Sequence, residues 1–287
     1  MADQHRLRQI LLSGNYDSSS DTLIQEAYVE RSREVKSPNF SLKGKVALVT
    51  GGTRGMGRAM ALTFAQAGAD VAVCSRHLPD AEKTAQEIRD LGRRSVAIRA
   101  DISRARDVDS MIDRVVTELG TLDILVNTAA VNVRKVLMDT SEEEWDFIHD
   151  VDLKGYFLCS KAAAKIMIAK KKGTIINVTS VGAKKPFATT GAYTVAKAGV
   201  AMLTKVLAVE LLPHNIRVNG IGPGPVRTQF NKELWTDPKK REEYESKLPL
   251  KRFAEAEEIS GIALLLASDA SSYMTGQTIY FDGGVLL

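Results

Sequence analysis

Tyr193 and Lys197 are separated by three residues in an apolar segment whose pattern predicts a helix. Residues four apart lie on the same face of a helix, so the phenol and the ammonium should face the same side. A free tyrosine loses its proton only near about pH 10, and a neighbouring positive charge lowers that pKa toward the range useful for general acid–base chemistry. Taken alone, a tyrosine and a lysine at this spacing are a weak signal, and their meaning depends on the segments around them.

Ser180 supplies that context. It closely follows the apolar run Ile175–Val178, which predicts a buried strand, and residues 181–192 then lead to Tyr193. A hydroxyl at a strand end can hydrogen-bond a substrate oxygen and hold it against the phenol. Most serines at strand ends have no such role, but this one precedes the tyrosine helix. We therefore predict that Ser180, Tyr193 and Lys197 form one catalytic group.

A glycine-rich loop follows the first apolar run, Val46–Thr50, and a helical pattern begins directly after it. Gly51 permits a tight turn out of the strand, Gly55 lets the backbone approach a pyrophosphate, and Gly57 lets the helix pack closely on a sheet. The spacing is G-x-x-x-G-x-G, which differs from the commoner G-x-G-x-x-G. Between a strand and a helix, this loop predicts a dinucleotide site.

The end of the second apolar run indicates which dinucleotide is bound. NAD sites commonly carry an acid there to hold the ribose 2′-hydroxyl, whereas a 2′-phosphate needs a cation. This chain reads Val73–Arg76 at that point, with no acid, and Arg54 in the glycine-rich loop offers a second cation. Guanidinium groups pair strongly with phosphate. The sequence therefore predicts NADP(H) in preference to NAD(H).

The elements that must position these residues follow a repeating pattern from Lys43 onward. Apolar runs of strand length alternate with amphipathic, helix-length segments, which is typical of a parallel sheet covered on both faces. The predicted strands are Val46–Thr50, Val71–Cys74, Val96–Arg99, Ile124–Asn127, Ile175–Val178, Ile216–Ile221 and Thr278–Phe281. We predict a single Rossmann-type, doubly wound α/β sheet of about seven strands, with ligands beyond the carboxyl ends of the strands.

The length and composition fit one domain, residues 41–287, preceded by a partly ordered N-terminal arm, residues 1–40. Net charge is +4, with 39 basic and 35 acidic residues interspersed, which argues against a nucleic-acid binder. No apolar stretch is long enough for a membrane span. The two cysteines are far apart in the sequence, which argues against a disulfide framework and favours the reducing cytoplasm. The four histidines show no spacing typical of metal ligands. The run Lys170–Lys172 should end a helix, with Gly173 as its left-handed cap.

Taken together, the motifs resemble those of the short-chain dehydrogenase/reductase family. The resemblance runs from Lys43 to Leu287, and its motifs are Thr50–Gly57, Asp101, Asn127–Ala130, Ser180, Tyr193, Lys197 and Pro223–Gly224. It implies that Tyr193 is the acid/base, that Ser180 positions the substrate oxygen, and that Lys197 also holds the nicotinamide ribose. The remaining cofactor contacts that it implies are Gly51, Thr53, Arg54, Gly55, Met56, Gly57, Arg76, Asp101, Ile102, Asn127, Ala129, Pro223, Gly224, Val226 and Thr228.

The chain departs from the family pattern at two positions. Ala130 stands where the family usually has glycine, which adds a methyl group. Asp152 stands where the family usually has an asparagine that supports a water-mediated proton path to the lysine. As a carboxylate, Asp152 can accept but not donate a hydrogen bond, and its charge should oppose ionisation of Tyr193. We expect the relay to persist with an altered pH profile. The alternative is an NADP-binding sensor or scaffold that has weak or lost turnover.

The substrate is the least determined feature. Five cations fall on segments expected near the pocket, namely Arg134, Lys135, Lys184, Lys185 and Arg227. They would suit a sugar acid or another anionic, polyhydroxy carbonyl compound as substrate. The alternative, which is the commoner role of such residues, is a solvated surface charge. Val133–Asp146 is similar to both the gluconate 5-dehydrogenase-like and the 3-oxoacyl reductase-like branches. Gln229–Lys247 is expected to form a mobile helical lid. Pro249–Ala270 and Thr275–Gly284 resemble the tetramer-forming branch of the family.

Overall fold

The computed structural model describes residues 37–287, and the segment Phe40–Leu287 forms one compact unit. The predicted N-terminal arm, residues 1–40, lies outside the described residues apart from residues 37–40.

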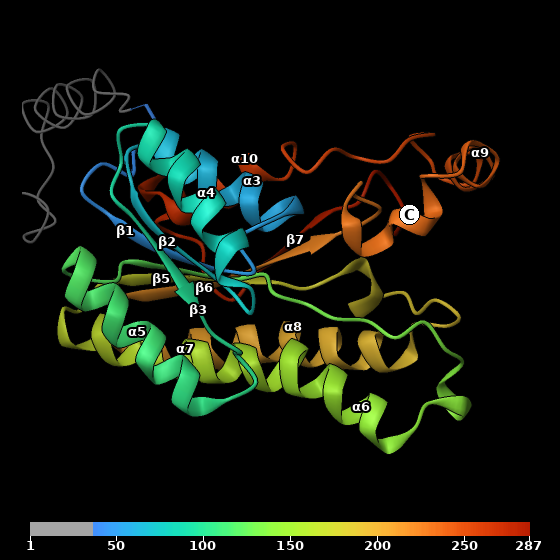
Figure 1. Cartoon of the computed structure of the whole chain (residues 1–287), viewed down its shortest axis with the longest axis horizontal. Coiled ribbons are helices and arrows are strands. Elements are labelled where there is room, and N and C mark those ends of the chain that lie inside the picture. Colours follow the sequence, from blue (N-terminus) through green and yellow to red (C-terminus); the bar gives the residue numbers. More distant parts are fainter. Residues whose placement is uncertain (1–36) are drawn as a thin grey trace, which may run out of the picture. The chain divides into compact units, whose positions relative to one another are not determined.

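Seven parallel strands form one sheet in the order β3-β2-β1-β4-β5-β6-β7 (Figure 1). The strands are β1 (Val46–Thr50), β2 (Asp70–Ser75), β3 (Ser95–Arg99), β4 (Ile124–Asn127), β5 (Gly173–Val178), β6 (Ile216–Pro223) and β7 (Thr278–Phe281). Each of them coincides with a predicted apolar run to within two residues at either end. The predicted doubly wound α/β fold is confirmed. The order reverses between β1 and β4, where such sheets bind ligands.

Helices cover both faces of the sheet (Figure 1). The helices α3 (Gly55–Gln66), α4 (Leu78–Asp90) and α10 (Ser260–Ala267) lie on one face, and α5 (Ala105–Leu119), α7 (Gly155–Ala169) and α8 (Gly191–Leu211) lie on the other. No helix among the described residues is both long and apolar enough to cross a membrane.

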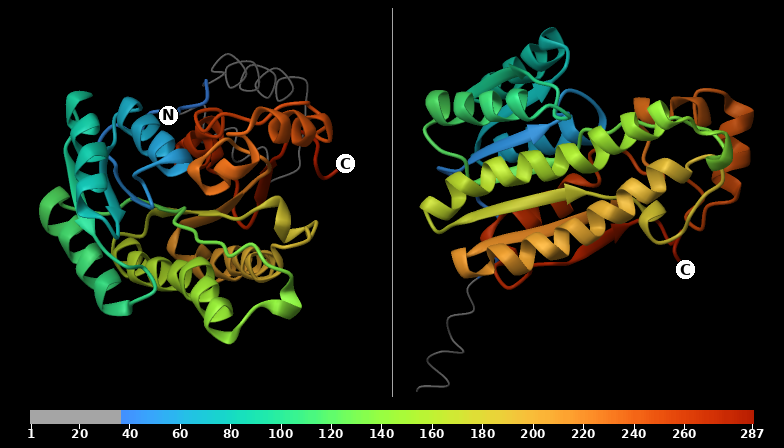
Figure 2. Two further views of the ribbon diagram at one scale, coloured as in Figure 1. Left: turned by 45° about the vertical axis from the view of Figure 1, so that its right-hand side comes forward. Right: turned by 90° about the horizontal axis from the view of Figure 1, so that it is seen from below.

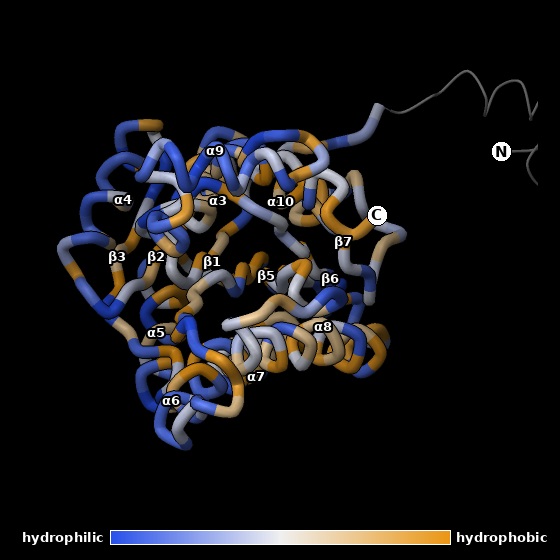
Figure 3. The backbone as a smooth tube through the Cα atoms, turned by 90° about the vertical axis from the view of Figure 1, so that its right-hand side faces the viewer, coloured by the Kyte–Doolittle hydropathy of each residue, from blue (hydrophilic) through white to orange (hydrophobic). Residues whose placement is uncertain are grey.

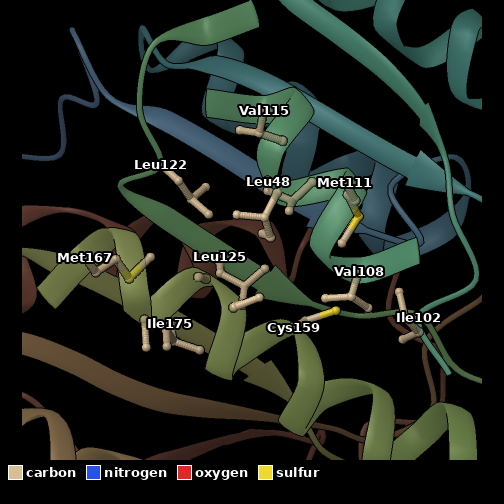
Figure 4. Close-up of a cluster of buried hydrophobic side chains, with 14 of the residues drawn as sticks. Leu48, Ile102, Val108, Met111, Val115, Leu122, Leu125, Cys159, Met167 and Ile175 are labelled. Atoms are coloured by element: carbon tan, nitrogen blue, oxygen red, sulfur yellow. The ribbon is translucent and has the colours of Figure 1, made fainter. Parts of the chain in front are cut away.

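The core is divided by the sheet into two layers because successive strand residues point to opposite faces. On β1, Leu48 packs toward α5 and α7, whereas Val49 packs toward α3 and α10. Figure 4 shows the first layer, in which Leu48 lies among Leu125 of β4, Met111 of α5 and Cys159 of α7. Each such buried side chain contributes roughly 2 kcal/mol to the free energy of unfolding. The two layers hold the carboxyl ends of the strands in place around the site.

A short stretch of π-helix connects two helices beside the site. Helix α6 (Glu142–His149) begins at a capping box in which the Ser141 side chain accepts from the Glu144 N–H while the Glu144 carboxylate accepts from the Ser141 N–H. The π-turn Asp150–Lys154 then leads directly into α7. Such turns occur mostly as single-turn insertions and often at functional sites. This one contains Asp152.

The end of α7 differs from the prediction. The left-handed residue is Lys171, with φ of 50°, and Gly173 is instead the first residue of β5. A Cβ on Gly173 would come within 2.4 Å of the Met167 sulfur, so packing against α7, and not helix capping, requires the glycine.

The segment predicted as a lid, Gln229–Lys247, is largely helical. It consists of a 3-10 helix, η5 (Gln229–Leu234), followed by α9 (Pro238–Ser246), and it lies beyond the carboxyl ends of the strands (Figure 2). The Trp235 indole N–H donates to the Thr228 carbonyl and so joins the residue after η5 to the residue before it. Helix α9 buries no residue and is almost wholly hydrophilic, unlike α7 and α8 (Figure 3).

Candidate active site

A cavity of about 850 Å³ opens at the carboxyl edge of the sheet, within the range of roughly 300–1,000 Å³ typical of small-molecule sites. The loops that follow β1 to β6, the lid segment and the C-terminal residues line it. It therefore lies where a doubly wound sheet is expected to bind its ligand. Ser180, Tyr193 and Lys197 line this cavity together.

Helix α8 and strand β5 deliver these three side chains. Tyr193 lies in the first turn of α8 and Lys197 lies one turn later on the buried side of the helix. Ser180 follows β5 and begins the short helix η3 (Val181–Ala183), because its Oγ accepts a hydrogen bond from the Gly182 N–H at 3.0 Å. This bond fixes the rotamer of Ser180 toward the cavity. A phenol, a hydroxyl and an ammonium thus converge on one space, an arrangement that can exchange a proton with a substrate oxygen.

The pKa of Tyr193 corrects the expectation from sequence. Burial raises it to about 12, the Lys197 ammonium lowers it, and the charge of Asp152 raises it again. A hydrogen bond with Ser180 also lowers it. The lysine acts in the predicted direction, but desolvation by the surrounding protein outweighs it. Tyr193 is therefore fully protonated at neutral pH.

Lys197 is buried, with 1% of its side chain exposed, and has three oxygen partners. Its Nζ atom donates to the Val178 carbonyl at 3.1 Å and to the Tyr156 hydroxyl at 3.0 Å. The third partner is the Asp152 carboxylate, which lies 3.3 Å away in an ion pair. A buried ammonium needs such partners because removing it from water is costly.

Asp152 is completely buried behind the cavity and does not line it. Burial raises the pKa of its carboxyl group above the usual value, while the Lys197 charge opposes that shift. Its other oxygen, Oδ1, accepts from the Val131 N–H at 2.8 Å. Asp152 thereby ties the loop after β4 to the start of α7, in addition to pairing with the lysine.

The glycine-rich loop has the shape that a pyrophosphate cradle requires. Gly51 has φ of +65°, and a Cβ there would lie 2.8 Å from the Ala129 backbone. A Cβ on Gly57 would lie 2.4 Å from the Gly51 carbonyl oxygen. The N-cap residue of α3, Arg54, provides no side-chain cap, so the first N–H groups of the helix are left to face the cavity. The residues present fit a dinucleotide.

Charged side chains surround the far end of this loop. Arg54 and Arg76 are exposed and line the cavity. Asp101 after β3 and Asp80 in the first turn of α4 also line it. Burial raises the pKa of Asp101, but hydrogen bonds from Ser103 and the charges of nearby arginines outweigh it, so the net shift is downward. Two guanidinium groups at one rim can bind a phosphate.

The structure brings nearly all of the predicted cofactor contacts to this cavity. Its lining includes Gly51, Thr53, Arg54, Gly55, Met56, Gly57, Arg76, Asp101, Ile102, Ala129, Pro223, Gly224, Val226 and Thr228. Asn127 is absent from it. That side chain points into the core, where its amide donates to the Asn177 side chain at 2.9 Å and to Ser160 at 3.1 Å. Its side chain therefore faces the core and not the cavity.

Aromatic and aliphatic residues that sequence reasoning did not single out cover the reactive end. Phe230 of η5 packs over Tyr193, with ring centres 5.5 Å apart, and Phe187, Tyr244 and Leu287 also line the cavity. Phe187 lies between Ser180 and Tyr193, so its position in that loop was a usable signal. Leu287 is far from the motifs in sequence, and only the fold brings it here.

Most of the cations expected to meet an anionic substrate have local partners. Arg134, Lys135 and Arg227 form salt bridges with glutamates: Glu233 at 2.7 Å, Glu144 at 2.8 Å and Glu255 at 3.0 Å, respectively. Lys184 lies over the Tyr280 ring at 4.5 Å. Lys185 lines the cavity and donates to the Val285 carbonyl at 2.9 Å. Among residues 37–287, no cluster of three or more His, Cys, Asp or Glu side chains is arranged to hold a metal.

Comparison with known proteins gives matches over nearly the whole described unit. A family model described as Enoyl-(Acyl carrier protein) reductase matches residues 51–286. The chain is 38% identical over 248 residues to a 2-dehydro-3-deoxy-D-gluconate 5-dehydrogenase of Escherichia coli, covering 86% of this chain and 97% of that protein. It is 39% identical over 244 residues to the 3-oxoacyl-(acyl-carrier-protein) reductase FabG of Staphylococcus epidermidis, covering 85% and 99%. A gluconate 5-dehydrogenase structure from Burkholderia cenocepacia, in complex with NADP and tartrate, matches with a TM-score of 0.83 at 33% identity, covering 87% and 98%.

Proposed function

Because the chain belongs to the short-chain dehydrogenase/reductase family of oxidoreductases, we propose that it interconverts a ketone and a secondary alcohol with NADP(H), using Tyr193 as the general acid/base. The observation that carries this proposal is the convergence of Ser180, Tyr193 and Lys197 on the cavity that also contains the glycine cradle. When bound, the nicotinamide supplies the hydride or accepts it.

The proton chemistry belongs to the chain's own residues. With a pKa of about 12, Tyr193 holds its proton at neutral pH and can donate it to a substrate oxygen during reduction. The Ser180 hydroxyl holds that oxygen against the phenol. Lys197 lowers the pKa of Tyr193, and as a cavity-lining ammonium it would bind the nicotinamide ribose. Asp152 pairs with the lysine from behind the cavity. In the oxidation direction Tyr193 must first lose its proton, so that direction should be favoured at alkaline pH.

The preference for NADP(H) over NAD(H) is supported by Arg54 and Arg76 at the cavity rim. A bound 2′-phosphate would be paired by these guanidiniums. The structure from Burkholderia cenocepacia that contains NADP agrees with this choice. An Arg76→Ala variant should bind NADPH at least 10-fold more weakly while its NADH affinity stays constant. Equal use of NADH by the natural chain, or an unchanged NADPH affinity in the variant, would count against NADP(H).

The proposed substrate is a sugar acid or another carbonyl compound with an anionic end. Two relatives, from Escherichia coli and Burkholderia cenocepacia, are named as gluconate-type dehydrogenases, which supports this class. Lys185 lines the cavity and donates to the Val285 carbonyl, which is not a carboxylate. The apolar cover over Tyr193 suits a carbon chain beside the carbonyl group. A Lys185→Met variant should raise KM for an acidic substrate about 10-fold and leave KM for a neutral ketone unchanged.

The decisive experiment mixes the full chain with NADPH and a panel of oxo acids, 3-oxoacyl thioesters and neutral ketones. Loss of NADPH absorbance should be abolished in Tyr193→Phe and retained in Tyr280→Phe, a control that removes a phenol hydroxyl from β7.

A second candidate function, an NADP-binding sensor, is favoured by one observation, the Asp152 carboxylate behind Lys197. Tight NADPH binding without turnover of any panel member would support the sensor and refute the enzyme.

We also propose that the chain forms a homotetramer in the cytoplasm. Helix α8 carries an exposed apolar stripe, Val195, Met202, Val206 and Val209, that a second copy could cover. Both cysteines are free and buried, in keeping with a reducing compartment. Mass measurement in solution should give four chains, and a Val209→Glu change should yield smaller species. A monomeric natural chain would refute the tetramer.

A further inference from the structure

A second buried phenol, that of Tyr156, lies directly against the candidate catalytic lysine. Tyr156 is in the first turns of α7 and has no exposed surface. Its Oη atom accepts from Lys197 Nζ at 3.0 Å and lies 3.3 Å from the Val178 carbonyl, to which it donates. The same ammonium lies 4.4 Å from the centre of the Tyr156 ring. Tyr156 is thus in contact with Lys197 through both its oxygen and its ring.

The direction of these bonds fixes the Tyr156 oxygen in one orientation. Its hydroxyl hydrogen is directed at the Val178 carbonyl, so a lone pair faces the ammonium. Burial, reinforced by the Asp152 charge, raises the pKa of Tyr156 well above its usual value, and the phenol stays neutral. The neutral Tyr156 oxygen therefore accepts a hydrogen bond from the Lys197 ammonium and adds no second negative charge close to Tyr193.

The Lys197 ammonium has three N–H groups and contacts three oxygen atoms, one each of Tyr156, Val178 and Asp152. The first two accept hydrogen bonds, whereas Asp152 Oδ2 is an ion-pair partner that makes no hydrogen bond. Tyr156 and Asp152 come from α7 and its leading π-turn, since residues 152 and 156 are one turn apart and both reach toward α8. The contact to Asp152 is the longest of the three, at 3.3 Å.

We propose that Tyr156 is a positioning residue that, with the Val178 carbonyl, holds Lys197 in place so that the third N–H group of the ammonium, which makes no hydrogen bond to Asp152, is left for the cofactor. The inference rests on the proposed function. It follows because the two hydrogen bonds use two of the three N–H groups of the ammonium, and the third has no hydrogen-bond acceptor among the described residues. The two shorter contacts then determine where the ammonium lies relative to Tyr193.

The test is the Tyr156→Phe variant, which keeps the buried ring and removes only the oxygen. Its kcat for ketone reduction should fall about 10-fold, the loss expected for one hydrogen bond to a charged group. KM for the ketone should stay within about 2-fold, because Tyr156 does not line the cavity. The NADPH dissociation constant should rise by about 5-fold. The matched control is Tyr280→Phe, and thermal melting shows whether each variant retains its fold.

The same substitution is then made in a Lys197→Met background. If Tyr156 acts through the lysine, Tyr156→Phe will change neither the residual rate nor the NADPH affinity there. Equal losses in both backgrounds would show a general packing effect and overturn the inference, as would wild-type kcat and NADPH affinity in the single variant. If the natural chain turns over no ketone, the proposed enzyme fails, and the NADPH affinities in the two backgrounds still decide the role of Tyr156.

Discussion

Replacing Asp152 by asparagine removes a buried negative charge from beside Lys197 with little change in shape. The asparagine oxygen can still accept the hydrogen bond from the Val131 N–H, so the loop after β4 should keep its position. The charge that raises the pKa of Tyr193 disappears. Lys197, no longer paired with a carboxylate, acts on Tyr193 more strongly. Both changes lower the pKa of Tyr193 below its present value of about 12.

The size of the change follows from the geometry. Asp152 Oδ2 lies 3.3 Å from Lys197 Nζ, which lies 5.6 Å from the centre of the Tyr193 ring, so the carboxylate is within about 9 Å of the ring. Two unit charges at that separation interact by roughly 2 kcal/mol at an effective dielectric constant of about 20, equivalent to a pKa change of about 1. Below that pKa the phenolate fraction increases about 10-fold.

The assay is single-turnover alcohol oxidation with NADP⁺ across the alkaline pH range, which reports the proton-transfer step. The Asp152→Asn profile should move about one pH unit toward acid, with oxidation about 10-fold faster at a fixed pH below the plateau. Titration of phenolate absorbance, taken as the difference from Tyr193→Phe, measures the same shift without turnover. An unchanged profile, or one displaced toward alkali, would refute the electrostatic role of Asp152.

Three further changes test other parts of the structure. Gly51→Ala places a side chain at φ of +65° and 2.8 Å from Ala129, so NADPH affinity should fall at least 10-fold in a fluorescence titration; wild-type affinity would contradict the cradle. Phe230→Ala removes the ring over Tyr193 and should raise ketone KM about 10-fold with NADPH affinity retained; a loss confined to NADPH binding would assign Phe230 to the cofactor. The pKa of the Asp70 carboxyl group is lowered, because the effect of Arg93 and Arg94 on it is larger than the opposing effect of burial. Asp70→Asn removes this carboxylate and should lower the free energy of unfolding by about 2 kcal/mol at pH 7. The stabilisation by Asp70 is present above the usual pKa of 3.8 and is lost as pH falls through the lower pKa that Asp70 has in the folded protein. A difference in unfolding free energy between Asp70→Asn and the natural chain that persists in strong acid would show that the charge of Asp70 is not its source.

The strands and the cofactor loop were predictable because their signals are local. A strand buried on both faces must be apolar along its whole length, and β1, β4 and β7 have the predicted bounds. The cradle required glycine at positions where backbone approaches backbone. The lysine partners carried no such signal. Tyr156 reaches Lys197 only because the π-turn, α7 and α8 are packed together, and Asn127 faces the core because of its strand phase.

The sequence by itself determined the fold class and brought Ser180, Tyr193 and Lys197 to one edge of a parallel sheet, since strand ends and helix faces follow from residue periodicity. Only the tertiary structure decided the electrostatics at that edge. Desolvation depends on every atom packed around a group, and it raised the pKa of Tyr193 where the neighbouring lysine alone predicted a lowering. The tertiary structure also decided that the lysine is held by Asp152, Val178 and Tyr156, because contacts between helices depend on how they pack.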